Sequence, residues 1–382
     1  MPAGLDIERT YNLNGTMSPY AQHLIISTGR SDWTSRIEDE RDTAVWGRFT
    51  AEIKAVLGRG GEFHDPFNNI IISTSSFKPW QLAKRDVLMQ RQTGKDQVVS
   101  VQAQSEVDAL LFPAFLHVRG LNLDADPDLL RKFVRSSLLP EPDRLHPIYS
   151  DLSDSERRAK TRDVGAGRFL VRPSVEAPTI LICSHGQRDS RCGILGPLLH
   201  AEFARYMDQR QVDERGVRLV PRTGEFIRRD DAPRGSSIEA STGAGSGTSA
   251  DEDDGVSSQL SRSPSSSSPD PTKHIDKRIN VNVGMLSHVG GHKWAGNVIL
   301  YIPPTFASHR PSSASSSSSS RARSSLSNLY PRPHPLAGMG IWYGRVEPRH
   351  VEGIVEQTLM QGKVIRELFR GGVSTTGEIL RL

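Results

Sequence analysis

Cysteine is scarce in this chain: its 382 residues include only Cys183 and Cys192, both in one short segment. A secreted domain held together by disulfides uses more cysteines, so we expect a reducing compartment. The first twenty or so residues contain no apolar signal-peptide core. They combine Arg9 with Asp6 and Glu8, which is a poor pattern for a mitochondrial presequence. The cysteine count therefore predicts a reducing environment, but the N-terminal segment does not identify the compartment.

Long apolar runs are also absent. The longest ones, such as residues 109–115, are far shorter than the ~20 residues that cross a membrane, so the sequence predicts no membrane span. The net charge is +4, but lysine and arginine are not concentrated in one block. This pattern argues only weakly for nucleic acid, and we expect no nucleic-acid partner.

Apolar residues make up 36% of the chain, which is low for a protein that is globular throughout. The shortfall lies in two serine-rich stretches, at about 231–272 and 308–327. Neither stretch has enough apolar side chains to offset the entropy lost on ordering. We therefore expect two disordered insertions within an otherwise folded chain.

The first part of the chain alternates between strand and helix patterns. Short β-branched runs predict strands, and apolar residues at helical spacing predict helices. The expected strands are 23–28, 69–74 and 109–112. One expected helix follows Thr43, with apolar residues as far as Leu57, and another opens at Pro127, with apolar residues as far as Leu138. This alternation predicts an α/β domain over residues 1–150, which contains no cysteine.

A polar connector, residues 151–174, leads to a second unit over residues 175–382. A strand at 179–182 runs directly into Cys183, and a helix follows Cys192. Further expected strands, at 282–285 and 297–302, bracket a loop that contains two histidines. The last expected helix begins at Pro348. The second unit is therefore also expected to be α/β.

Four residues with metal-binding side chains occur as two local pairs. Cys183 and Cys192 form the first pair, and His288 and His292 form the second. Four such ligands are the number that a tetrahedral metal site or a [2Fe–2S] cluster requires. The cysteines stand at a strand end and a helix start, where backbone amides favour the thiolate that binds metal.

The neighbours of these pairs suggest supporting roles. Gly290 and Gly291 lie between the histidines, where glycine permits positive φ and a close approach of the backbone to an inorganic group. His185 lies near Cys183 and is expected to act as a hydrogen-bond donor beside the site rather than as a ligand. Asn297 is expected to support the loop that carries the histidines.

Each pair alone is a weak signal. Two cysteines are most often packed thiols, and a His-x-x-x-His pair arises easily in a chain with twelve histidines. The conjunction of the only cysteines with a glycine-bracketed histidine pair is stronger. We rank a [2Fe–2S] cluster first, zinc second and a redox disulfide third, since classical zinc fingers place their cysteines only ~2–4 residues apart.

The order strand, Cys-x8-Cys, helix and then a second pair resembles the thioredoxin-like [2Fe–2S] ferredoxins, in which the second pair is Cys-x3-Cys. Three segments are more similar still to the sucrase/ferredoxin-like family, and to a fungal branch of it: Cys183–Gly193, His288–Asn297 and Trp342–Val346. The resemblance implies a thioredoxin-like C-terminal domain with a bis-histidine cluster, preceded by a degenerate thioredoxin-like domain. No pair of carboxylates stands in a recognisable glycosidase setting.

These observations predict an electron-transfer or redox-sensing protein rather than a substrate-converting enzyme. Cys183 and Cys192 are expected to bind one iron and His288 and His292 the other, as in Rieske centres. The partner is expected to be an unidentified redox protein. The resemblance implies a mitochondrial location, with the cytoplasm as the alternative. Two other functions stay open: a thiol–disulfide oxidoreductase using the two cysteines, although a Cys-x-x-Cys motif is missing, and a zinc-stabilised binding module.

Overall fold

The computed structural model describes residues 4–82, 105–168, 170–213, 216–224, 277–307 and 333–382. Both serine-rich stretches lie outside these residues, and so does the prediction that they are disordered. None of the described helices is long and apolar enough to cross a membrane.

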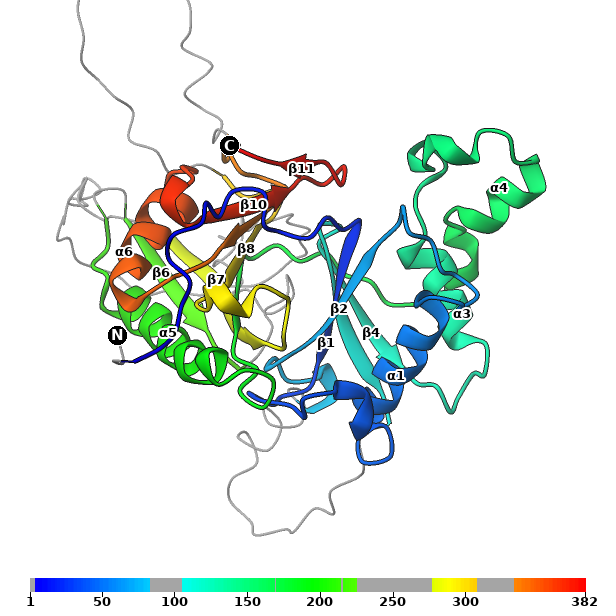
Figure 1. The fold of residues 1–382 in the computed structure, drawn as a ribbon, viewed down its shortest axis with the longest axis horizontal. Helices are drawn as coiled ribbons and strands as arrows, with labels where there is room; N and C mark the ends of the chain where they lie inside the picture. Colours follow the sequence, from blue (N-terminus) through cyan, green and yellow to red (C-terminus); the bar gives the residue numbers. More distant parts are fainter. Residues whose placement is uncertain (1–3, 83–104, 169, 214–215, 225–276, 308–332) are drawn as a thin grey trace, which may run out of the picture.

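One large mixed sheet runs through the described part of the chain, and helices pack against it (Figure 1). Its strands follow the order β11-β10-β9-β8-β5-β7-β2-β1-β3-β4, with β6 paired to β7. The strands are β1 (Gln22–Ser27), β2 (Ile70–Ser75), β3 (Val107–Phe112), β4 (Leu116–Leu121), β5 (Thr179–Cys183), β6 (Val217–Arg222), β7 (Lys277–Leu286), β8 (Val298–Ile302), β9 (Met339–Tyr343), β10 (Phe369–Val373) and β11 (Ile379–Leu380). The α/β class predicted from the sequence is confirmed.

The apolar runs of the sequence form the centre of this sheet. All residues of β1 and of β5 are buried. Strands covered on both faces carry continuous apolar runs instead of alternating ones, which explains why these two were easy to predict. β1 pairs in parallel with β2, and β5 pairs in parallel with β7.

The strands of the two halves of the chain meet where β2 lies beside β7. Ser75 pairs with Leu286 at this joint. The amide of Ser287 donates to the carbonyl of Thr74 at 2.8 Å, and the amide of Ser76 donates to the carbonyl of Met285 at 2.9 Å. The ladder is short, but it makes the sheet continuous across the molecule (Figure 1).

Helices cover each half of the sheet. The N-terminal half carries α1 (Val45–Leu57) and α3 (Leu129–Phe133), which continues in a π turn over Val134–Leu138. The C-terminal half carries α5 (Ser190–Gln209) and α6 (Val351–Gly353), which continues in a π turn over Ile354–Met360. The predicted connector contains α4 (Asp154–Lys160), whose start is fixed by a capping box between Ser153 and Glu156. The helices expected from periodicity are confirmed.

The core consists of three clusters of buried side chains. One belongs to the N-terminal half, around Phe49 and Phe133, and one to the C-terminal half, around Phe203. The third joins the halves: Phe112 stacks on Tyr301 with ring centroids 4.0 Å apart. The predicted domain limits at 150 and 175 stay predictions, because the halves share a sheet and a core cluster.

The start of the described chain lies on the C-terminal half before it reaches β1 (Figure 1). The amide of Glu8 donates to the carbonyl of Lys293 at 2.8 Å, and the amide of Gly15 donates to the carbonyl of Arg370 at 2.9 Å. Ile7 is buried in the core cluster of the C-terminal half. Residues 5–19 therefore form a strap that connects both halves.

Candidate functional site

The two cysteines lie side by side in the interior. Cys183 is the last residue of β5, and Cys192 is in the first turn of α5. Both are free thiols, 2% and 0% exposed. The helix begins after Asp189, whose carboxylate accepts a hydrogen bond from the amide of Arg191 at 3.0 Å. The predicted strand end and helix start are both present, and they bring the thiols into hydrogen-bonding contact.

This contact polarises the pair. The hydrogen bond from Cys192 lowers the pKa of Cys183 well below its usual range, against the opposing effect of burial. The His288 imidazole and the backbone amide of His185 lower it further. The hydrogen bond to Cys183, burial and the charge on Cys183 raise the pKa of Cys192. The contact therefore favours ionisation of Cys183, with Cys192 as the proton donor.

The two histidines come from the histidine loop, residues 287–297, which joins β7 to β8. Their ring centroids are 5.1 Å apart. The Nδ1 of His288 is buried and has no hydrogen-bond partner among the described residues. A buried polar atom of this kind requires an explanation, and an absent ion is one of the recognised ones. His288 also interacts with Cys183, so the histidine pair lies next to the cysteine pair.

The arrangement is two adjacent pairs rather than one compact group. No three His, Cys, Asp or Glu side chains in the described ranges are placed to hold a single metal ion. A [2Fe–2S] cluster makes a different demand, because each of its two irons takes its own pair of protein ligands. Two thiols, one of them with a lowered pKa, and two imidazoles, one with an unpartnered nitrogen, suit that donor set chemically.

A buried arginine holds the histidine loop in place. Arg370, on β10, is 2% exposed, and its Nη1 donates to the Oδ1 of Asn297 at 2.7 Å. Asn297 donates in turn from Nδ2 to the carbonyl of Gly291 at 3.1 Å. The guanidinium also lies over the ring of Trp294, 5.1 Å from its centroid. Burial lowers the pKa of Arg370 to about 10, while the nearby charge on Cys183 acts in the opposite direction.

The two glycines of the loop have different surroundings. Both have positive φ, 83° at Gly290 and 75° at Gly291. A Cβ on Gly291 would lie 2.5 Å from Nη2 of Arg370, whereas a Cβ on Gly290 would have no described atom within 4 Å. The close neighbour of Gly291 in this structure is thus the arginine that supports the loop, a residue that the sequence did not single out.

His185 links the two pairs to the N-terminal half. It is 1% exposed, and its Nε2 donates to the carbonyls of Trp33 and Thr34, both at 2.9 Å. Its Nδ1 accepts a hydrogen bond from the amide of His288 at 3.3 Å. The side chain therefore bonds to the backbone on both sides, and its own amide faces Cys183.

The N-terminal half also fixes the cysteine loop, residues 184–189. Asp32 accepts from the amide of Gly186 at 2.9 Å, and Ser184 donates from its hydroxyl to the carbonyl of Ser31 at 2.9 Å. Sequence reasoning assigned no role to Asp32. The signal was present in the segment Ile25–Trp33, which ends a strand with a glycine turn followed by Ser-Asp.

The strap closes the site from the other side. The Oε2 of Glu8 accepts a hydrogen bond from Nε1 of Trp294 at 3.1 Å, and the same carboxylate pairs with Arg345. Glu347 pairs with Arg9 at 2.8 Å. The histidine loop is therefore bonded both to the strap, through Trp294, and to β10, through Asn297.

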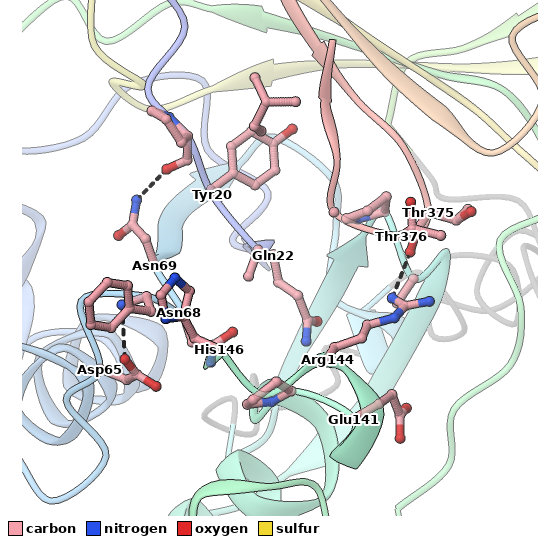
Figure 2. A pocket seen from close by; sticks show the side chains of 18 of the residues that line it. Tyr20, Gln22, Asp65, Asn68, Asn69, Glu141, Arg144, His146, Thr375 and Thr376 are labelled. Atoms are coloured by element: carbon pink, nitrogen blue, oxygen red, sulfur yellow. Dashed lines mark hydrogen bonds between the residues drawn. The ribbon is translucent and has the colours of Figure 1, made fainter. Parts of the chain in front are cut away.

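A cavity of about 510 Å³ lies away from these residues, among loops of both halves (Figure 2). Gln22, Asn68 and His146 line it, and Arg144 crosses to the C-terminal half by donating to the carbonyl of Thr375 at 3.0 Å. None of the four candidate ligands lines this cavity. It is separate from the cysteine–histidine site.

The fold and the site define an α/β protein with a buried cysteine pair beside a histidine pair. The chain belongs to the sucrase/ferredoxin-like family, whose model matches residues 13–371, so the resemblance found in the sequence is confirmed.

Curated relatives share one name, "Altered inheritance of mitochondria protein 32". The chain is 37% identical over 386 residues to the one from Debaryomyces hansenii, covering 98% of this chain and 90% of the relative. It is 24% identical to the one from Clavispora lusitaniae over 63% of this chain and 51% of the relative. For Meyerozyma guilliermondii the identity is 23%, over 64% and 51%. The chain thus spans about half the length of the latter two. No solved structure matches it.

Proposed function

We propose that this protein binds a [2Fe–2S] cluster through Cys183, Cys192, His288 and His292 and acts as a one-electron carrier or redox sensor. The observation that supports the proposal is the adjacency of a buried, hydrogen-bonded thiol pair to a histidine pair whose His288 Nδ1 lacks a partner among the described residues. In this proposal each half of the chain is a thioredoxin-like unit, the first of them degenerate.

The ligand set determines the redox chemistry. A bound cluster supplies a site that accepts and releases one electron. Neutral imidazoles in place of two thiolates leave less negative charge at the site, so its potential is expected well above the roughly −400 mV of plant-type ferredoxins. Each coordinating imidazole keeps a second nitrogen that can hold a proton. We expect the midpoint potential to fall with rising pH, and a flat potential between about pH 6 and 10 contradicts this proton coupling.

Anaerobic purification of the full chain tests the assignment. We expect about two irons and two acid-labile sulfides per chain, with a reduced EPR signal of low average g. Cys183→Ser and His292→Ala should lose this signal. His64→Gln, a change at an exposed histidine of the N-terminal half, should keep it. Freshly isolated native protein without iron and sulfide overturns the proposal.

One observation favours a second candidate, a thiol–disulfide oxidoreductase. The two thiols are in hydrogen-bonding contact, and Cys183 has the lowered pKa typical of reactive cysteines. Their exposures of 2% and 0% oppose this function, because the thiolate has to reach the disulfide that it attacks. A metal-free protein that forms and releases the Cys183–Cys192 disulfide reversibly, as followed by mass spectrometry, would establish it.

The compartment is proposed from the relatives. Their shared name refers to the inheritance of mitochondria, and we propose a mitochondrial location for this chain. The cytoplasm is the alternative. Subcellular fractionation of cells that express the full chain at its native level separates the two, with a cytoplasmic marker and a matrix marker as controls.

A further inference from the structure

A second cavity, of about 330 Å³, adjoins the histidine side of the site. His288 forms part of its wall, together with His185 and Arg188 from the C-terminal half. The N-terminal half supplies the other lining residues, which include Arg36 and Lys54. We call this hollow the arginine cavity. Neither cysteine nor His292 lines it, so it lies beside the ligand pairs rather than between them.

The walls of the arginine cavity carry an excess of positive charge. Lys54 is paired with Glu38 at 2.8 Å, and the same carboxylate also interacts with the charge of Arg36, so one acidic side chain faces three basic ones. Arg36 and Arg188 form no ion pair with any other described residue. The Nη1 of Arg188 donates to the carbonyl of Ser35 at 3.2 Å, which orients its guanidinium without neutralising it.

Arg36 and Arg188 are both exposed and line the same hollow, so an anion bound between them would reduce their mutual repulsion. A concave site with charge of one sign also concentrates counter-ions. Guanidinium is the side chain best suited to carboxylate and phosphate oxygens, which it binds with paired hydrogen bonds. The volume exceeds what one carboxylate fills, so the charge and the space together favour a small dianion.

Some residues that line the arginine cavity also hold the segments that carry the candidate ligands. His185 holds the carbonyls of Trp33 and Thr34 on one side and the amide of His288 on the other. Arg188 is in the cysteine loop, and Arg36 directly follows Ser35, the residue to which Arg188 bonds. An anion held by the two arginines therefore lies next to His288.

We propose that the arginine cavity binds a small dianion with carboxylate or phosphate groups, held by Arg36 and Arg188 against His288. The binding itself depends only on these side chains. Its consequence rests on the proposed function: negative charge beside His288 stabilises the oxidised state of the site and lowers its midpoint potential. The dianion is then a regulator of electron transfer, and the N-terminal half supplies part of its binding site.

Isothermal titration of the full, anaerobically purified protein with inorganic phosphate and with succinate, at constant ionic strength, tests the binding. We expect one site per chain. Arg36→Gln and Arg188→Gln should each weaken binding about tenfold, since a charge-assisted hydrogen bond contributes on this scale. Arg131→Gln, a change at an exposed arginine on α3, is the matched control and should leave it unchanged.

Three outcomes overturn the proposal. One is the absence of binding to either probe. Another is binding that Arg131→Gln weakens as much as the two cavity variants do. The third is binding of an acidic peptide alone, which would make the site a protein contact.

A redox titration of the same preparation, with and without succinate, separates this inference from the proposed function. A lowered potential that is lost in Arg36→Gln supports both. If the protein binds the dianion but contains no iron, the proposed binding site stands and the proposed [2Fe–2S] cluster is refuted. A cluster whose potential ignores a bound dianion refutes the regulatory role alone.

Discussion

Arg370 donates from Nη1 to the Oδ1 of Asn297 at 2.7 Å, and both side chains are buried. Asn297 passes this restraint on to the carbonyl of Gly291. A residue on β10 thus fixes the conformation of the histidine loop from the neighbouring part of the sheet. The two candidate histidine ligands therefore depend on a residue that is more than seventy positions away in the sequence.

Arg370→Met should destabilise the metal-free protein by about 1–3 kcal/mol, because it leaves the buried Oδ1 of Asn297 without a donor. Urea unfolding under anaerobic, metal-free conditions measures this loss. The control is Arg131→Met, where the side chain is 62% exposed and a change within about 0.5 kcal/mol is expected. Equal losses in the two variants contradict the assigned role of Arg370.

Gly291→Ala and Gly290→Ala form a matched pair. Both place a side chain at positive φ, which costs about 1 kcal/mol. Only the Gly291 variant also forces a methyl group against the guanidinium of Arg370. We expect Gly291→Ala to be the less stable of the two in urea and to retain less iron after anaerobic purification. The same stability and iron content in both variants would show that the Arg370 side chain moves aside without a loss of free energy of unfolding.

His23 predicts an acid-sensitive fold. It is fully buried, and its ring nitrogens lie 2.9 Å from the hydroxyl of Tyr301 and 3.0 Å from that of Ser73. Burial lowers the pKa of His23 to about 3. Because the unfolded chain takes up this proton near pH 6.5 and the folded chain does not, this contribution is complete above about pH 6.5 and is lost as the pH falls toward 3.

The expected loss is about 1.4 kcal/mol per pH unit well below pH 6.5. Urea unfolding at a series of pH values measures it. His23→Gln should be less stable at neutral pH but should have a shallower pH dependence than the parent. His64→Gln, at an exposed histidine, should keep the parent slope. A parent slope that persists in His23→Gln would assign the acid sensitivity to other groups.

The cysteine pair predicts a single thiolate in metal-free, reduced protein. The hydrogen bond from Cys192 lowers the pKa of Cys183, and the resulting charge raises the pKa of Cys192. The ultraviolet thiolate band should therefore correspond to about one charge per chain at about pH 7, with the second appearing only in strong alkali. Cys192→Ala removes the donor and should raise the pKa of Cys183, whereas Cys192→Ser should largely preserve it. Two thiolates titrating together near pH 8.5 would contradict the pairing.

Local patterns were enough for the central strands and for the cysteine segment. The apolar runs of β1 and β5 are buried on both faces, and α5 buries Leu195, Leu199, Phe203 and Met207 as the helical spacing predicts. These elements depend on their own residues, so the sequence predicts them well. The same is true of Cys183 and Cys192, which a strand end and a helix start place together.

Strand β10 and the residues that support the histidine loop depend on partners that are distant in the sequence. β10 contains Gly371 and Gly372, which weaken a strand by propensity, yet a Cβ on Gly371 would lie only 2.9 Å from the strap at Met17. Arg370 and Glu8 are ordinary charged residues in the sequence. Their roles arise from contacts with the histidine loop more than seventy positions away. Periodicity carries no information about such contacts.

The joint at Ser75 and Leu286 has a consequence for any attempt to study the halves apart. A fragment of residues 175–382 would retain all four candidate ligands but would lose Asp32, the strap and the neighbour of β7. Its bare strand edge would be free to pair with other molecules. Dissection should therefore yield an aggregating fragment with a loosened cysteine loop, so the site has to be studied in the full chain.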